Sequence, residues 1–282
     1  MKKLAGTILV IIWCALLLSI QPAFGLPPVQ RTVLDNGLIV LISEEHSLPF
    51  VSILLLVKAG SKDDPSGQEG VADLTASASL LGTVGRTTEQ INEDLDYMGA
   101  HIDANANKDF TTIGLRALTK DLRRAFPILM DILNRPTFPD KELKKEKSRI
   151  LGALQSEEDE PGTVAEKAFE KNLYVGGPYG HSPEGTKESV SRLNRQNLLN
   201  FHKIHYHPGN SILVVVGDAD EQTVKEYLIP MLQKWPKKAG SYKQVQNRFI
   251  KEKKTIEINK PVSQSNIIIG NAAMIPQTMQ NR

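Results

Sequence analysis

The stretch that decides the fold is Gly70–Thr83, which reads GVADLTASASLLGT and carries one charged side chain, Asp73. The run 71–81 predicts a helix rich in small residues. Small side chains let such a helix pack closely against a neighbouring sheet. The elements on either side of this stretch indicate what the helix packs against.

Three apolar runs precede this helix. The runs 30–34 and 38–43 are joined by Asn36-Gly37, and both of these residues tolerate a positive φ, so the pattern predicts a β-hairpin. The third run, 50–59, is nearly all apolar and predicts a central strand that other elements cover.

Further helices and strands follow. Thr87-Thr88-Glu89-Gln90 is a capping pattern that predicts the start of a helix over 87–98. The remaining predicted elements are strands over 100–107, 109–117 and 212–216 and helices over 120–134, 140–158, 162–173, 194–204 and 221–232. This order predicts an α+β domain in which helices cover one face of an antiparallel-rich sheet.

The C-terminal part changes in character. The segment 234–247 is polar, contains Pro236 and Gly240, and is typical of a linker. Two short strands are predicted after it, over 254–258 and 266–269.

The N-terminus has the order of a secretory signal. Lys2 and Lys3 precede an uncharged apolar run, Leu4–Ile20, and small residues follow in QPAFG. This order predicts cleavage after Gly25. The alternative is an uncleaved anchor, because the 17 apolar residues approach the roughly 17–25 needed to span a bilayer.

Composition narrows the possible chemistry. The only cysteine, Cys14, lies in the predicted signal, so the mature chain would have no thiolate for metal or nucleophilic chemistry. Without the two signal lysines, 32 basic residues face 32 acidic ones. That balance gives no electrostatic reason to expect nucleic acid as a partner.

The stretch 70–83 resembles the signature helix of the pitrilysin/insulinase (M16) zinc peptidases, G-x-A-H-x-x-E-H-x-x-x-x-G-T. Gly70, Ala72, Gly82 and Thr83 fall in place. Further matches run in family order from 30 to 218: Asp35-Asn36-Gly37-Leu38, Phe138-Pro139, Glu160-Pro161, Pro178-Tyr179-Gly180, Gly185-Thr186-Lys187-Glu188-Ser189-Val190, Tyr206-His207-Pro208-Gly209-Asn210 and Val214-Val215-Val216-Gly217-Asp218. The ordered series is more specific than any one motif.

The resemblance implies a zinc site whose residues are replaced in this chain. Asp73 stands at the first zinc histidine, Ala76 at the general base and Ser77 at the second histidine. Ala153 stands at the third ligand, a glutamate in the family, with 75 residues between it and Ser77. A catalytic zinc site needs three protein ligands and an open position. These four positions therefore predict no catalytic residue, no metal and no cofactor, although the resembled family uses zinc.

A rival metal site is formed by His202, His205 and His207. The first two are at i and i+3 and could share one face of a helix end. The alternative reading is a solvated helix terminus, where histidine suits the helix dipole. We favour the second reading, because no base and no shielded cleft are evident beside these residues.

The resemblance implies an exported M16 peptidase-like protein that is not catalytic by itself. It would be the partner of a catalytic M16 subunit in a heterodimer, or a domain that binds peptide substrates. In the family, substrate adds to a sheet edge by backbone pairing, which needs no zinc. The alternative is a zinc-dependent metalloendopeptidase that acts through relocated ligands or a partner's residues. A third possibility is a degenerate remnant without function.

The expected domain organisation follows from the same resemblance. Residues 1–25 are the signal peptide, 26–236 an M16 peptidase-like N-terminal domain, 237–253 a linker and 254–282 the start of a truncated second M16-like domain. The expected location is periplasmic or extracellular. Contact with a membrane is expected only if the signal is not cleaved.

Overall fold

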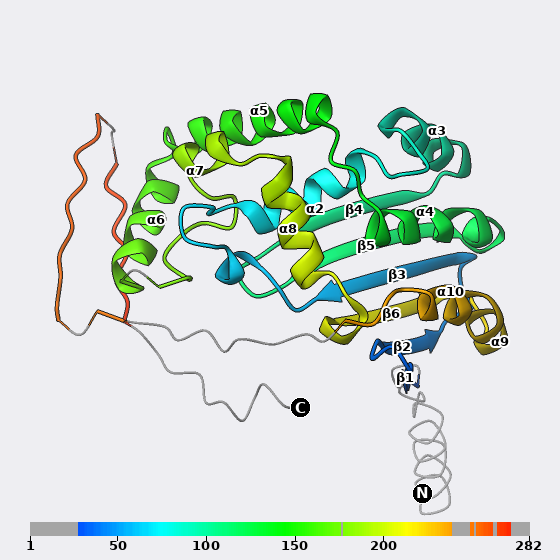
Figure 1. Ribbon diagram of the computed structural model, residues 1–282. Coiled ribbons are helices and arrows are strands. Elements are labelled where there is room, and N and C mark those ends of the chain that lie inside the picture. The colour runs from blue at the N-terminus through cyan, green and yellow to red at the C-terminus, as the bar shows by residue number, and fades with distance from the viewer. Residues whose placement is uncertain (1–27, 176, 239–248, 251, 262–263, 272–282) are drawn as a thin grey trace, which may run out of the picture.

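A six-stranded mixed sheet organises the protein (Figure 1). The computed structural model describes residues 28–175, 177–238, 249–250, 252–261 and 264–271. The strands are β1 (Gln30–Val33), β2 (Ile39–Glu44), β3 (Phe50–Val57), β4 (His101–Ala106), β5 (Thr111–Leu118) and β6 (Ser211–Gly217). Their spatial order is β1-β2-β6-β3-β5-β4. Neighbours are antiparallel except β2 and β6, which are parallel.

Most of the helices lie over one face of this sheet, whereas α6 lies beyond its end, next to the C-terminal segment (Figure 1). The α-helices are α2 (Val71–Ala78), α3 (Thr88–Met98), α4 (Leu122–Asn134), α5 (Asp140–Glu157), α6 (Pro161–Leu173), α7 (Lys187–Arg192), α8 (Arg195–His205), α9 (Glu221–Thr223) and α10 (Ile229–Gln233). A π-helical turn, Val224–Leu228, joins the last two. Short 3₁₀ turns occupy Ser61–Asp63, Ser79–Leu81, Thr119–Asp121 and Pro208–Asn210. Helix α2 packs on β4 and β5, with α8 and α5 over it.

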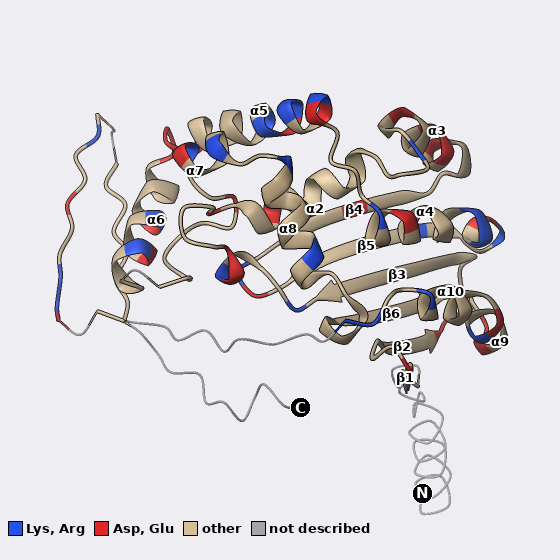
Figure 2. Ribbon diagram, in the orientation of Figure 1, with Lys and Arg blue, Asp and Glu red and all other residues tan. Residues whose placement is uncertain are grey.

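Side chains along the central strands point alternately to the two faces of the sheet, one buried and one exposed. In β3, Val51, Ile53 and Leu55 are buried under the helices. Each such side chain stabilises the fold by about 1.5–3 kcal/mol. The opposite face is open in the described part of the chain, where Leu54 is 41% and Val216 40% exposed. Figure 2 shows no charged residue on β3 or β6, so the centre of this open face is apolar.

The structure confirms the predicted fold class, an α+β domain with an antiparallel-rich sheet covered on one face. The predicted cap of α3 is also present: the Thr87 side chain accepts from Gln90 N, and Thr87 N donates to Gln90 Oε1 at 3.0 Å. The sequence reasoning did not predict α7, a short helix that Thr186 caps through Ser189 N.

The strands predicted over 254–258 and 266–269 are wrong. The described residues of this segment contain no assigned strand. A strand requires a neighbour for its backbone groups, whereas this segment lies beside the helix α6, with Ile250 N donating to Leu173 O at 3.0 Å. The predicted signal peptide and most of the predicted linker lie outside the described residues. Among the described helices, none is both long and apolar enough to cross a membrane.

Candidate functional site

Two glycines and a buried carboxylate fix the start of α2. Asp64 accepts hydrogen bonds from Gly70 N at 2.7 Å and Ala72 N at 2.9 Å, and His181 Nε2 lies 3.3 Å away. Burial raises the pKa of Asp64, while these three donors oppose the rise. Gly70 and Gly185 have φ of +94° and +80° and lie back to back. A Cβ on Gly185 would be 2.2 Å from Glu69 O, so only glycine fits there.

Asp73, at the position of the first zinc histidine, faces the edge of the sheet. Its Oδ1 lies 3.5 Å from Ala106 N on β4. Burial, and then the negative charge of Glu184, raise the pKa of Asp73 to about 6. The carboxyl group is therefore partly protonated near neutral pH, because its charged form has lost solvation and faces another acid.

Ala76 and Ser77 complete the altered face of α2. Ala76 is fully buried and has no side-chain donor or acceptor. The Ser77 hydroxyl donates to Leu74 O at 3.5 Å and lies beside Glu146 of α5. Neither residue can take a proton from a metal-bound water in the way a carboxylate does.

An ion pair on α5 stands opposite these residues. Glu146 binds Arg149 through two contacts, Nη2–Oε1 at 2.7 Å and Nε–Oε2 at 2.9 Å. Arg149, and then Ser77, lower the pKa of Glu146. Asp73 adds to the field that raises the pKa of Arg149. The sequence reasoning missed this pair, although Glu146 is seven residues before Ala153 and so shares its helix face.

The position of the third zinc ligand, Ala153, lies on the exposed surface of α5, which packs against α2. The four altered positions thus belong to two adjacent helices. They do not fit a zinc ion: Asp73 is the one carboxylate, Ser77 is a neutral hydroxyl, and the two alanines offer no donor atom. In the described parts of the chain, no group of three or more His, Cys, Asp or Glu side chains could hold a metal.

The favoured reading of the rival histidines, a solvated helix terminus, is wrong for two of them, because His202 and His207 are buried. His202 is buried, its Nε2 lies 3.0 Å from Leu133 O, and burial lowers its pKa to about 4. The His205 ring lies 4.4 Å from the ring of Phe201, centroid to centroid. His207 is buried, 3% exposed, and Gly209 packs close to its ring.

The free edge of β4 lies next to Asp73. β4 is the last strand of the sheet. Asn107 N donates to Phe110 O at the turn into β5, and hydrogen-bonded pairs alternate along an antiparallel ladder. Ile102, Ala104 and Ala106 therefore point their backbone groups away from β5. The contact between Ala106 N and Asp73 agrees with this direction.

Two family models and several known proteins match this chain. Residues 39–187 match the family model Insulinase (Peptidase family M16), and residues 192–273 match the model Peptidase M16 inactive domain. An uncharacterized zinc protease of Rickettsia bellii is 31% identical over 194 residues, 68% of this chain and 47% of that protein. Cytochrome b-c1 complex subunit 1 of Bos taurus is 28% identical over 202 residues, 72% of this chain and 42% of that protein.

A solved structure of an M16 protein has a similar fold. The peptidase M16 inactive domain from Pseudomonas fluorescens superposes with a TM-score of 0.74 at 27% identity, over 78% of this chain and 54% of that chain. The chain spans about half the length of the relatives it matches. The matched models, the relatives and the sheet with its overlying helices together show that this chain belongs to the insulinase family of M16 peptidases.

Proposed function

We propose that this protein is a non-catalytic member of the M16 family that binds extended peptides along the free edge of β4. The observation that carries the proposal is the donor set at the altered site. Asp73, Ala76, Ser77 and Ala153 retain one carboxylate and one hydroxyl, too few to hold a zinc ion and activate a water.

Peptide binding needs only the strand edge. The outward N–H and C=O groups of Ile102 and Ala104 are suited to pair with an added strand. The small side chains of Ala104 and Ala106 are half-buried on the helix side of β4, and they leave room there for side chains of the peptide. Affinity would come from the backbone pairing, which does not select a sequence strongly.

The binding experiment uses the mature protein, residues 26–282, and a fluorescent unstructured peptide followed by anisotropy. Ala104→Pro removes one outward N–H without breaking the ladder to β5, and we expect peptide binding to weaken at least tenfold. Ala104→Ser keeps the N–H and is the matched control, with expected wild-type affinity. Absence of any saturable binding by the wild-type protein would refute the peptide-binding role.

Catalysis is tested on the same sample. We expect no cleavage of the peptide and no stoichiometric zinc by metal analysis. Chelator-sensitive hydrolysis by the purified protein alone would refute the non-catalytic role and would favour a site with relocated ligands. Analysis of a His202, His205 and His207 triple alanine variant would then show whether those residues hold the metal.

The partner is proposed to be a catalytic M16 subunit with an intact H-x-x-E-H helix. Relatives named as subunits of larger assemblies, such as cytochrome b-c1 complex subunit 1, support a role within a complex. Light scattering of the co-purified pair should give one copy of each subunit. A mixture that elutes as two separate proteins at micromolar concentration would count against a heterodimer.

We also propose that the chain is exported. Its proposed segments are a signal peptide over 1–25, an N-terminal domain over 26–236, a linker over 237–253 and the start of a second domain over 254–282. The order of basic, apolar and small residues at the N-terminus supports export. Its destination is proposed to be the periplasm or the exterior.

A further inference from the structure

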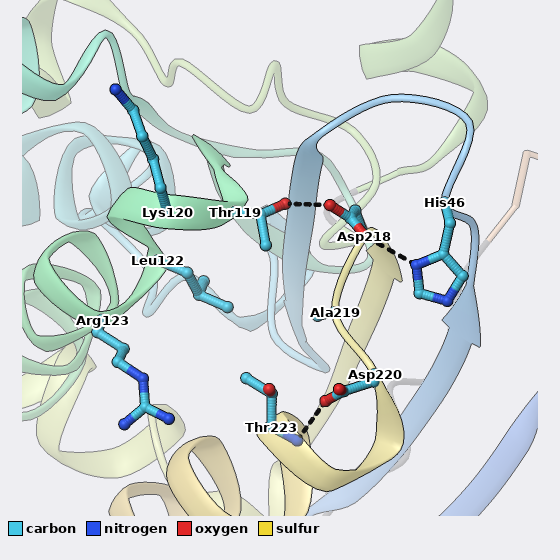
Figure 3. A pocket seen from close by; sticks show the side chains of 9 residues that line it. All are labelled: His46, Thr119, Lys120, Leu122, Arg123, Asp218, Ala219, Asp220 and Thr223. Atoms are coloured by element: carbon cyan, nitrogen blue, oxygen red, sulfur yellow. Dashed lines mark hydrogen bonds and ion pairs between the residues drawn. The ribbon is translucent and has the colours of Figure 1, made fainter.

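A pocket lies at one end of the sheet, away from α2 and the edge of β4. Its volume is about 320 Å³, and its lining includes His46, Thr119, Arg123, Asp218, Asp220 and Thr223 (Figure 3). They come from the β2–β3 connection, from the segment that joins β5 to the first turn of α4, and from the segment that joins β6 to α9, including α9 itself. The pocket therefore sits beyond the carboxyl ends of the parallel neighbours β2 and β6, which is a common place for ligands in open sheets.

The acids of this pocket are already engaged by donors of the protein. Asp218 Oδ1 lies 2.7 Å from His46 Nδ1, and its Oδ2 accepts from Thr119 Oγ1 at 2.9 Å (Figure 3). The hydrogen bond to Asp218 is the main cause that raises the pKa of His46. Asp220 accepts from Thr223 N at 2.6 Å and caps α9.

Arg123 is held differently. Its guanidinium lies over the Tyr227 ring, 4.7 Å from the centroid, and the Tyr227 hydroxyl donates to Arg123 O at 2.7 Å. Within the described ranges, no carboxylate oxygen lies within 4.0 Å of this guanidinium. Stacking fixes the plane of the group and leaves its N–H donors for another acceptor. In this pocket the acids already accept hydrogen bonds from the protein, whereas the guanidinium N–H groups of Arg123 have no acceptor among the described residues.

We propose that this pocket binds a small anion, a carboxylate or phosphate group anchored by Arg123. A planar guanidinium can bind either group through two parallel hydrogen bonds. Lys120 also lines the pocket, with its Nζ 4.0 Å from Asp121 Oδ2. The contacts of Asp218 with His46 and Thr119 reduce its repulsion of the ligand. The volume is at the lower end of the range for ligand pockets, so the ligand is a free ion or a small organic acid or phosphate.

The test titrates the mature full-length protein with inorganic phosphate and, in a separate arm, with acetate. Chloride at equal ionic strength gives the reference, and the thermal midpoint and isothermal calorimetry are the readouts. We expect saturable binding with a Kd in the millimolar range for at least one anion. Saturation by phosphate alone identifies the phosphate class, and saturation by acetate alone identifies the carboxylate class.

Two arginines of α4 provide matched variants. Arg123→Met should weaken anion binding at least tenfold, whereas Arg124→Met should bind as the wild type does, because Arg124 lies over Tyr97 and outside the pocket. His46→Gln should weaken binding severalfold, since it leaves the Asp218 charge unbalanced. No saturable response to either anion, or equal binding by the two arginine variants, would overturn the proposal.

Discussion

Asp73, Glu146 and Arg149 are the charged residues at and beside the positions that align with the zinc site of the resembled family. The helix face that holds zinc in the resembled family now carries carboxylates from α2 and α5 and one guanidinium. The arginine supplies part of the positive charge that a metal would bring. Its contact with Glu146 is bidentate, yet the Arg149 side chain is 63% exposed, so the pair stabilises the fold by at most about 1 kcal/mol.

The raised pKa of Asp73 predicts a pH-dependent stability. The folded pKa of about 6 lies above the ordinary value of 3.8 for an aspartate, so the native state holds the proton more tightly. The stabilising contribution is present below pH 4 and is lost as the pH rises to about 6. Asp73→Asn removes the ionisation. We expect its free energy of unfolding to exceed that of the wild type by about 3 kcal/mol at pH 8, with little difference at pH 4. Urea unfolding at both values measures this, and equal curves at pH 8 would contradict it.

Restoring the four altered side chains should restore metal binding. Ala76 is fully buried, so Ala76→Glu alone should lower the free energy of unfolding by about 3 kcal/mol through an unpaired buried charge. In the variant Asp73→His, Ala76→Glu, Ser77→His, Ala153→Glu, zinc at a thousand times its Kd should recover about 4 kcal/mol. Thermal unfolding with and without zinc measures this recovery.

The triple variant that keeps Ala153 is the control for this experiment, and it should respond weakly because it lacks the third ligand. A quadruple variant whose midpoint does not change with zinc would mean that the frame no longer holds the family geometry.

At the scale of elements, the start of α2 depends on the contact of two loops. Gly185 packs against Glu69 O, and Gly70 against Glu184 O, where an added Cβ would be 2.2 Å and 2.6 Å away. This contact holds α2 against the segment before α7 and thereby places Asp73 beside β4.

Gly185→Ala tests this contact, and Gly67→Ala is its control. Both glycines have a positive φ, +80° and +79°, but an alanine at Gly67 would meet nothing within 4 Å. Backbone strain should therefore be similar, at roughly 1 kcal/mol. Steric overlap should make Gly185→Ala less stable by about a further 2 kcal/mol. Chemical unfolding measures the stability of both variants. An equal loss of unfolding free energy in the two would contradict the role of this contact.

The sequence predicted individual helices and strands better than it predicted which elements pack against each other. The start of α3 was predictable because its capping box lies within four consecutive residues, Thr87-Thr88-Glu89-Gln90. The Glu146–Arg149 pair faces Ser77 only because α5 packs on α2, and no local pattern reports that packing. The sequence predicted strands over 254–258 and 266–269, but strand formation depends on a pairing partner that the described residues do not supply there.

At the scale of the whole molecule, export and assembly are the open properties. The mature chain has equal numbers of basic and acidic residues if the signal ends at Gly25. Specific contacts would therefore have to determine partner choice, since net charge does not attract either sign.

Cleavage of the signal predicts a defined mature mass. When the chain is expressed with a functional secretion system, intact-mass measurement should find a protein that begins at Leu26. A species that retains Met1 in the membrane fraction would instead support an uncleaved anchor, since Leu4–Ile20 approaches the length of a span.

The position of β6 has a consequence for when the domain can fold. β6 lies between β2 and β3, although it begins only at Ser211. A nascent chain that ends before Ser211 cannot join the β1–β2 hairpin to the rest of the sheet. Closing so long a loop slows folding, so the sheet is completed only after most of the chain has been made. If the chain is exported as proposed, the late position of β6 would keep it unfolded, and so able to cross a membrane, for most of its synthesis.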